Sequence, residues 1–249
     1  MMKNVTGLDL VKFLAGSHGT LAVFSEVTFK VQPVAETEAT LAIAGLDDVR
    51  AVAALSAALG SPFSVTGAAH RPAAGGDVAR TLLRIEGFDA SVAARARKLV
   101  ALLAGYGGAE IVPAEASRAL WRAIRDLDLL DGAHHAATPL WRVSVKPADG
   151  PKVAAAVRAG FDARFLYDWG GGLLWIAGGT GADAGASVVR AAVAAAGGHA
   201  TLMRAPDAVR LAVDVFEPLS PPLADLTRRM KATFDPAGIL NPGRMHAGV

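Results

Sequence analysis

The sequence contains no cysteine among its 249 residues. This absence excludes disulfide bonds, thiolate zinc sites, cysteine-ligated iron–sulfur clusters and covalent attachment of a cofactor through sulfur. Any iron–sulfur centre that works with this protein must therefore be carried by another chain.

Long hydrophobic runs are also missing. The alanine-rich stretch 186–198 is short and contains Arg190, so it does not have the pattern of a transmembrane helix. The opening residues 1–16 contain Asp9 and Lys12 where a secretory signal requires an unbroken apolar run. We therefore predict a cytoplasmic protein that reaches a membrane only through partners.

The charge has no strong bias, with 25 Lys and Arg against 23 Asp and Glu and a formal charge of +2. No basic run with interleaved aromatic residues is present that would follow a phosphate backbone, so nucleic acid is not an expected partner. Hydrophobic residues make up 52% of the chain, which is enough to form the core of one large domain or two smaller ones.

Hydrophobic periodicity predicts the same order of elements twice. In the first copy, Asp47 and Asp89 mark the starts of two helices among four strands; the second copy has the same order. The predicted strands are 40–44, 63–66, 81–86, 110–112, 140–145, 163–167, 173–177 and 199–203, and the second pair of helices is 151–159 and 183–196. This order predicts an α+β fold made of two ferredoxin-like βαββαβ repeats, about 38–112 and 138–203, with an antiparallel sheet and helices on one face.

Segments outside the repeats carry their own patterns. Residues 10–14 read as a short helix, the alternating run 21–31 as a strand, and Pro113 opens an amphipathic helix with Leu120, Trp121 and Ile124. The tryptophans at 141, 169 and 175 fall on or beside strands, where packing in the core or a hairpin is a more common role than a substrate site.

Residues 231–245 contain several residues that end helices or form turns. Their sequence is Lys-Ala-Thr-Phe-Asp-Pro-Ala-Gly-Ile-Leu-Asn-Pro-Gly-Arg-Met. Asp235 and Pro236 end a helix, Gly238 permits a turn, and Pro242 stiffens the segment again. Each dipeptide alone is ordinary turn chemistry. Together they predict a tail that must lie in one place.

A second glycine-rich stretch, Gly16-Ser17-His18-Gly19-Thr20, precedes the alternating run. Glycine has no Cβ, so backbone N–H groups at such a loop can approach an anion or a flat ring closely. The bare pattern is also common in simple tight turns. It is neither a P-loop nor a dinucleotide-binding fingerprint.

These motifs resemble the FAD-linked oxidases of the vanillyl-alcohol-oxidase type. The tail matches their Phe-Asp-Pro-x-Gly-Ile-x-Asn-Pro-Gly ending, and Asp168-Trp169-Gly170-Gly171 is similar to a string in the FAD-binding E subunits of bacterial glycolate oxidases. The resemblance implies a remnant of the FAD-binding domain at 1–34, a cap domain at 35–230, and a tail at 231–249 that returns to the flavin. It implies cofactor contacts from Asn4, Thr6, Gly7, Gly16, Ser17, Gly19, Thr20, Leu21 and Asn241.

The resemblance further implies a subunit of an FAD-dependent 2-hydroxy acid (glycolate) oxidase complex. Its partners would be a catalytic flavin subunit and an iron–sulfur subunit. Catalytic relatives carry a His-x-x-Gly-Asp-Gly-Asn-x-His pattern that has no match in this sequence, so we predict a chain that is not catalytic alone, with unknown catalytic residues and no metal site.

Two further expectations follow. Family members begin with a long glycine-rich flavin-binding domain, and this sequence matches only its last segment, so we expect weak or no FAD binding by a truncated frame, a fragment or the product of a split gene. The alternative function is a non-enzymatic interaction module, able to form a homodimer. His134 and His135 are candidates for a base or a metal pair, and His70 and Arg71 for contact with an anionic substrate, but all four are more typical of solvated loops. His18 lies in the glycine-rich turn, where it could approach a flavin phosphate, although the resemblance does not imply a specific role for it.

Overall fold

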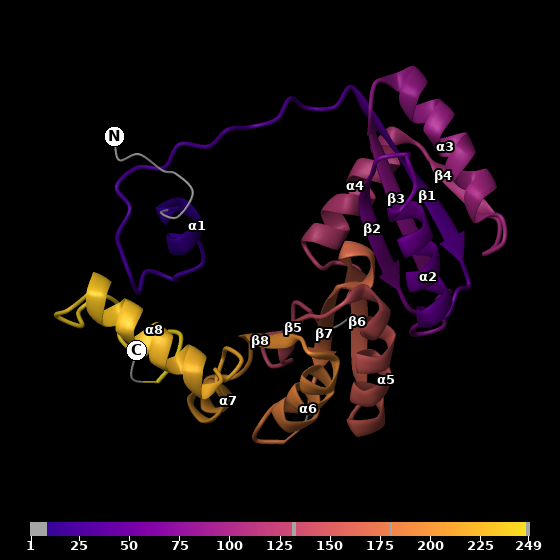
Figure 1. Cartoon of the computed structure of the whole chain (residues 1–249). Coiled ribbons are helices and arrows are strands. Elements are labelled where there is room, and N and C mark those ends of the chain that lie inside the picture. Colours follow the sequence, from indigo (N-terminus) through magenta and orange to yellow (C-terminus); the bar gives the residue numbers. More distant parts are fainter. Residues whose placement is uncertain (1–8, 131–132, 180, 248–249) are drawn as a thin grey trace. The chain divides into compact units, whose positions relative to one another are not determined.

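A computed structural model describes residues 9–130, 133–179 and 181–247. The chain divides into two compact units (Figure 1). Unit 1 consists of Met1–Gln32 and Asp214–Val249, and unit 2 of Pro33–Val213. Segments from the two ends of the sequence thus share one unit.

Unit 2 is built on one antiparallel sheet of eight strands, which confirms a mixed fold of strands and helices. Its strand order is β4-β1-β3-β2-β6-β7-β5-β8. The strands are β1 (Thr37–Ala44), β2 (Val65–Arg71), β3 (Arg80–Gly87), β4 (Ala109–Val112), β5 (Leu140–Ser144), β6 (Ala163–Asp168), β7 (Leu173–Gly178) and β8 (His199–Arg204).

Helices cover both faces of this sheet. One face packs against α2 (Asp48–Leu59), α3 (Asp89–Leu103), α5 (Gly150–Gly160) and α6 (Ala186–Ala196) through the two largest apolar clusters. On the opposite face, α4 (Ala114–Arg125) brings Trp121 and Ile124 against Ala42 and Leu82. The four helices of the predicted repeats thus lie on one face, as expected, and the separate helix α4 covers apolar residues on the other.

Two short helices, η1 (Pro147–Asp149) and η2 (Trp169–Gly171), and α7 (Asp207–Ala212) complete unit 2. Glycines explain how η2 packs. Gly170 and Gly171 have φ values of +68° and +105°, and a Cβ on them would lie 2.5 Å from Leu59 and 2.7 Å from Val52, both on α2. Residues 169–172 connect the antiparallel strands β6 and β7, and this connection also contacts a helix of the other half of the sheet.

Val49 and Leu59 of α2 are exposed, while Ala51, Ala54 and Leu55 form its buried face. Asp47 caps α2 as predicted, accepting a hydrogen bond of 2.8 Å from the N–H of Arg50. The predicted strand 21–31 is irregular, and its apolar side chains are largely exposed because no neighbouring strand pairs with them in the described chain.

Unit 1 contains α1 (Leu10–Leu14), as predicted, and α8 (Pro221–Phe234). The rings of Phe13 on α1 and Phe234 at the end of α8 lie 5.0 Å apart between centroids, so the two helices share an aromatic contact. No helix in the described part of the chain has the length and hydrophobicity that crossing a membrane requires.

The two halves of the sheet in unit 2 meet where His70 of β2 pairs with Tyr167 of β6. Asp48, at the start of α2, accepts hydrogen bonds of 2.6 Å from the Tyr167 hydroxyl and from Arg158 of α5. His70 is fully buried on β2, which corrects its assignment to a solvated loop; its Nε2 lies 3.4 Å from Asp48 Oδ1. Asp48 therefore links one half to the other.

This network changes the acidity of its members. Burial opposes ionisation of Asp48, but the contacts with His70, Tyr167 and Arg158 outweigh it and lower the pKa of Asp48 to about 2. Burial, followed by the negative charge of Asp48, raises the pKa of Tyr167. At neutral pH, Asp48 is thus an anion that accepts hydrogen bonds from Tyr167 and Arg158, with His70 Nε2 3.4 Å away.

We expect the substitution Asp48→Asn to lower the free energy of unfolding by about 1–3 kcal/mol at neutral pH, because buried donors lose a charged acceptor. The folded-state pKa of Asp48 is depressed, so its contribution is complete above about pH 5 and is lost as the pH falls toward about 2. Urea unfolding of both proteins between those pH values, followed by tryptophan fluorescence, measures the difference.

Asp162→Asn is the matched control, since Asp162 forms an exposed ion pair with Arg164 and such pairs contribute little. A difference between wild type and Asp48→Asn that stays constant down to the acid end would contradict the assigned role of Asp48.

Candidate functional site

Within unit 1, the glycine-rich loop and the tail predicted to share a site lie against each other. The side-chain N–H of Asn241 donates a hydrogen bond of 2.9 Å to the carbonyl of Gly19. A Cβ on Gly19 would lie 2.9 Å from Asn241 Nδ2, so only glycine permits this approach without a shift. Residues 222 positions apart in the sequence thus form one local structure.

A buried lysine holds the two segments together. The Nζ of Lys231 donates to the carbonyl of Thr20 at 2.8 Å, the carbonyl of Leu240 at 2.6 Å and the carboxylate of Asp235 at 2.6 Å. Both Lys231 and Asp235 are buried. Three donors meet three acceptors, so the charge of Lys231 is compensated and the loop is fixed to the tail.

Asp235 organises the tail in turn. Its carboxylate accepts hydrogen bonds from the N–H groups of Ile239 and Leu240, at 3.2 and 2.8 Å. The hydrogen bond from Lys231, and then that from Leu240, lowers the pKa of Asp235. The Asp-Pro-x-Gly turn is therefore closed by its own aspartate.

The loop backbone is strained and has free donors. His18 and Asn241 have φ values of +51° and +43°, which few residues other than glycine adopt without cost, and Gly16 and Gly19 are also at positive φ. In the described chain, the N–H groups of Gly16, His18, Gly19 and Leu21 make no hydrogen bond. Free N–H groups in such a loop are suited to an anion or an electronegative ring edge.

The predicted contact residues differ in their availability. Asn4, Thr6 and Gly7 lie outside the described residues. Ser17 and Thr20 are buried, and both the N–H and the hydroxyl of Thr20 bond to the carbonyl of Ser17. Gly16 is exposed, Gly19 and Leu21 are half-buried, and Asn241 is exposed.

Sequence reasoning missed Lys231, Asp235 and the aromatic contacts around the loop. The ring of His18 lies 5.0 Å from that of Phe216, which lies 5.9 Å from that of His246. The spacing of Lys231 and Asp235, four residues apart at a helix end, was the available signal for an ion pair, but it did not reveal burial.

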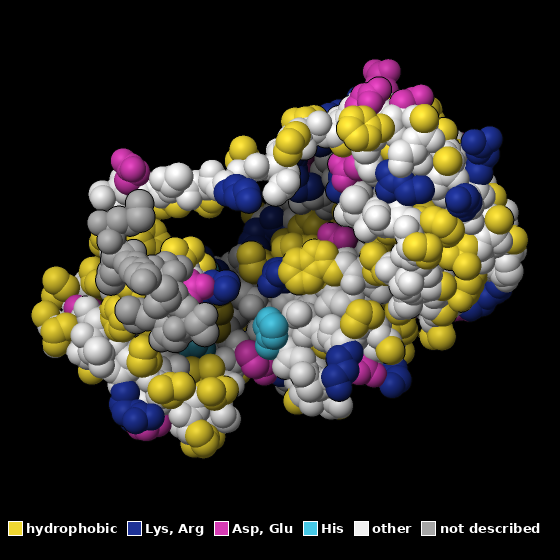
Figure 2. Space-filling model, turned by 45° about the horizontal axis from the view of Figure 1, so that its top comes forward, with side chains coloured by type: hydrophobic (Ala, Val, Ile, Leu, Met, Phe, Trp, Pro, Cys, Tyr) yellow, Lys and Arg dark blue, Asp and Glu magenta, His cyan; other side chains and the backbone are white. Residues whose placement is uncertain are grey.

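Unit 2 contains a separate cavity of about 780 Å³. It lies between α4, the start of η2 and strands from both halves of the sheet. Two acidic residues, Glu38 and Asp168, line it against five arginines: Arg84, Arg118, Arg122, Arg125 and Arg142. Arginines therefore outnumber acidic residues in the cavity lining. On the face drawn in Figure 2, by contrast, Lys and Arg are interspersed with acidic and hydrophobic side chains.

Tryptophans form much of the apolar lining of this cavity. Trp121, Trp169 and Trp175 line it, whereas Trp141 is fully buried and donates to the carbonyl of Ala184 at 3.1 Å. Packing in the core is thus confirmed for Trp141, while Trp169 is 57% exposed. Burial raises the pKa of Asp168, although its carboxylate accepts a hydrogen bond from the N–H of Trp169.

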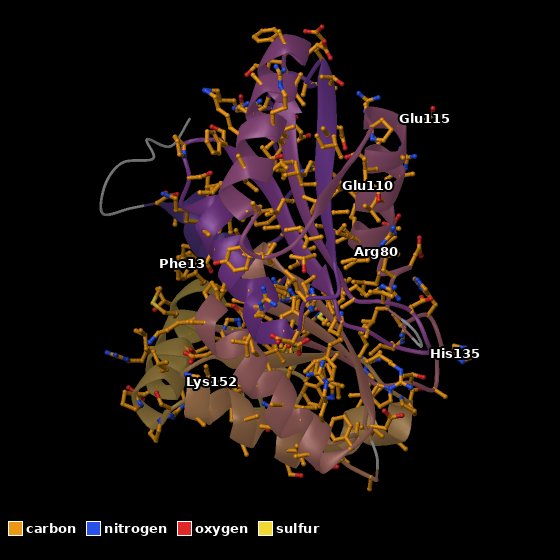
Figure 3. All side chains as sticks on the ribbon, turned by 90° about the vertical axis from the view of Figure 1, so that its right-hand side faces the viewer. Phe13, Arg80, Glu110, Glu115, His135 and Lys152 are labelled. Carbon is orange, nitrogen blue, oxygen red and sulfur yellow. The ribbon has the colours of Figure 1, made fainter. Side chains whose placement is uncertain are left out.

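The remaining histidine candidates lie on the surface. His134 contacts Asp128 at 3.0 Å and is exposed, and His135 points away from the ribbon into solvent, as Glu115 does (Figure 3). Over the ranges that the structure describes, no group of three or more His, Asp or Glu side chains is arranged to hold a metal ion.

Comparison with known proteins confirms the resemblance predicted from the motifs. Residues 215–245 match the family described as FAD linked oxidases, C-terminal domain. The chain is also 31% identical over 252 residues to the glycolate oxidase subunit GlcE of Escherichia coli (strain K12). The match includes 99% of this chain and 60% of that relative, so the chain spans about three fifths of the length of GlcE.

Solved structures with a similar fold include two of alkyldihydroxyacetonephosphate synthase. Their TM-scores are 0.61 and 0.64, each at 16% sequence identity. Each match covers 97% of this chain and 50% of the synthase chain. At this identity the similarity extends to the fold alone.

The Lys231 contacts lead to a test of how unit 1 is held. We expect Lys231→Met to speed amide hydrogen exchange at Ile239 and Leu240 by at least about tenfold, because Asp235 loses its buried counter-ion and the turn opens more often. Exchange followed by mass spectrometry or NMR measures this change. Arg229→Gln, an exposed change on the same helix, is the control. Equal exchange in both variants would contradict the role given to Lys231.

Proposed function

We propose that this chain is the cap and flavin-site portion of a subunit of an FAD-dependent 2-hydroxy acid (glycolate) oxidase complex. The observation that carries the proposal is the contact between Asn241 and the Gly19 loop, made by the two motifs that resemble the flavin site of the family. The similarity to GlcE along 99% of the chain supports it. The name of that relative is the source of the proposed substrate, glycolate.

The proposed domain organisation follows from the same similarity. Residues 1–34 and 231–249 would belong to the flavin side, and residues 35–230 to the cap. The cap would be a duplicated ferredoxin-like unit: read from the outer edge, each half of the sheet has its own strands in the order fourth, first, third, second. Two such halves side by side are what a duplicated βαββαβ unit would produce.

The loop residues fit part of a flavin cofactor. FAD would supply the hydride-accepting chemistry when bound, and the free N–H groups of His18 and Gly19 would meet an electronegative edge of it. Asn241 would position the loop through the Gly19 carbonyl. Because FAD also has two phosphates and an adenine ring, four free N–H groups in this loop cannot hold all of it, and we propose weak binding by this chain alone.

Catalysis would depend on partners. We propose a catalytic flavin subunit and an iron–sulfur subunit, since a chain without cysteine cannot ligate such a cluster through thiolates. A surface for a partner is available in the irregular segment 22–34, where Val23, Phe29 and Val31 are about four-fifths exposed. These exposed side chains also favour the second candidate, a non-enzymatic interaction module, with a homodimer as one outcome.

Co-expression with the flavin and iron–sulfur subunits of a glycolate oxidase tests the proposal. We expect the three chains to purify together with bound flavin and with glycolate-dependent dye reduction, while the isolated chain shows no stoichiometric FAD binding in equilibrium dialysis. Gly19→Ala is expected to lower the flavin content of the complex, because a Cβ at φ +74° would meet Asn241 at 2.9 Å.

Gly105→Ala is the matched control, since a Cβ at Gly105 meets no atom within 4 Å and its φ is ordinary. Stoichiometric FAD binding by the isolated chain would overturn the proposed weak binding. A stable, flavin-free chain that joins no such complex would favour the interaction module.

A further inference from the structure

Arg142 of β5 lines the cavity of unit 2. Its guanidinium carbon lies 5.2 Å from the centroid of the Trp169 ring, which restricts the orientation of the side chain. Arg142 is half-buried, and within the described residues its guanidinium makes no hydrogen bond or ion pair. A guanidinium with free donors and limited access to water binds a carboxylate or phosphate favourably.

Indole rings lie around this guanidinium. Trp175 of β7 is the direct cross-strand neighbour of Arg142 and shares its face of the sheet. On the other side of the cavity, the Trp121 ring packs on the backbone of Gly67, where a Cβ would lie only 2.7 Å from it, and donates to Thr40 Oγ1 at 2.7 Å. The Trp121 ring is therefore held in place by contacts within the protein.

The acidic side chains of the cavity have partners other than Arg142. Glu38 accepts a hydrogen bond of 2.6 Å from Ser117 and lies 3.8 Å from Arg118. Asp168 accepts a hydrogen bond of 2.7 Å from the N–H of Trp169. Neither forms an ion pair with Arg142. Arg84 pairs with Glu86 and Arg125 with Asp126, whereas Arg142 has no ion pair among the described residues.

The size of the cavity indicates what accompanies the anionic group. A volume of about 780 Å³ lies within the usual range for drug-sized ligands, roughly 300–1,000 Å³. A carboxylate with one small substituent, such as glycolate or lactate, would leave most of this volume and the indole rings in contact with water. A flat apolar body would cover the rings.

We propose that this cavity binds an organic anion with an aromatic ring, with Arg142 holding the oxyanion head and Trp121 and Trp175 contacting the ring. The site consists of residues of unit 2 alone and goes beyond the proposed function, so it stands or falls independently of FAD binding and complex assembly. Aromatic carboxylates and aromatic phosphates share this chemistry.

Tryptophan fluorescence of the purified chain provides the test, because all four tryptophans belong to unit 2 and three line the cavity. Titration with 3-phenyllactate is expected to change the fluorescence saturably. Lactate, which differs by the phenyl ring, is expected to bind at least about tenfold more weakly, because it buries no ring. Phenyl phosphate, titrated separately, distinguishes the two sources of the anion.

Variants test the residue that holds the head. Arg142→Gln is expected to weaken binding of 3-phenyllactate about tenfold, since a charged hydrogen bond is lost, whereas Arg97→Gln, an exposed change on α3 outside the cavity, leaves binding unchanged. If circular dichroism shows that Arg142→Gln does not fold, the exposed cavity residue Arg122→Gln replaces it, with weaker binding again expected.

Three results would overturn the proposal. They are equal affinity for lactate and 3-phenyllactate, equal affinity for the neutral amide 3-phenylpropanamide, and no saturable change with either aromatic anion. Undiminished binding by folded Arg142→Gln would remove the role of Arg142.

Discussion

The hydrogen-bonded Asp48 is the contact on which the arrangement of unit 2 depends most. The two halves of the sheet pair directly through His70 and Tyr167, and Asp48 joins a helix of one half to a strand and a helix of the other. A buried anion with several donors is directional, unlike apolar packing, and so it fixes one relative position of the halves. The glycine contact of η2 with α2 supports the same junction.

The cavity of unit 2 is a consequence of that junction. Arg84 and Trp121 come from the first half of the chain's sheet elements, while Arg142 and Trp175 come from the second. A shift between the halves would separate these groups, although none of them takes part in the Asp48 network. The buried polar contact on one face therefore positions the indole and guanidinium groups on the other.

Unit 1 uses the same physical principle on a smaller scale. The buried cation of Lys231 makes three hydrogen bonds, and these connect a loop and a tail from opposite ends of the chain. These contacts hold His18 and Asn241 in backbone conformations that would otherwise be unfavourable. In the described chain, four backbone N–H groups of the loop held in this way make no hydrogen bond.

The sequence by itself determined the order of helices and strands, because periodicity and turn residues record short-range constraints. Its motifs also carried the family resemblance, and that resemblance implied that the glycine-rich loop and the tail share a site. The sequence also predicted the α2 cap at Asp47 correctly. Only the tertiary structure decided the burial of His70 and Lys231, the placement of α4 and the assembly of the arginine and tryptophan cavity. These depend on contacts between residues far apart in the chain, for which no local pattern exists; for the same reason the alternation at 21–31 predicted a strand that lacks a partner.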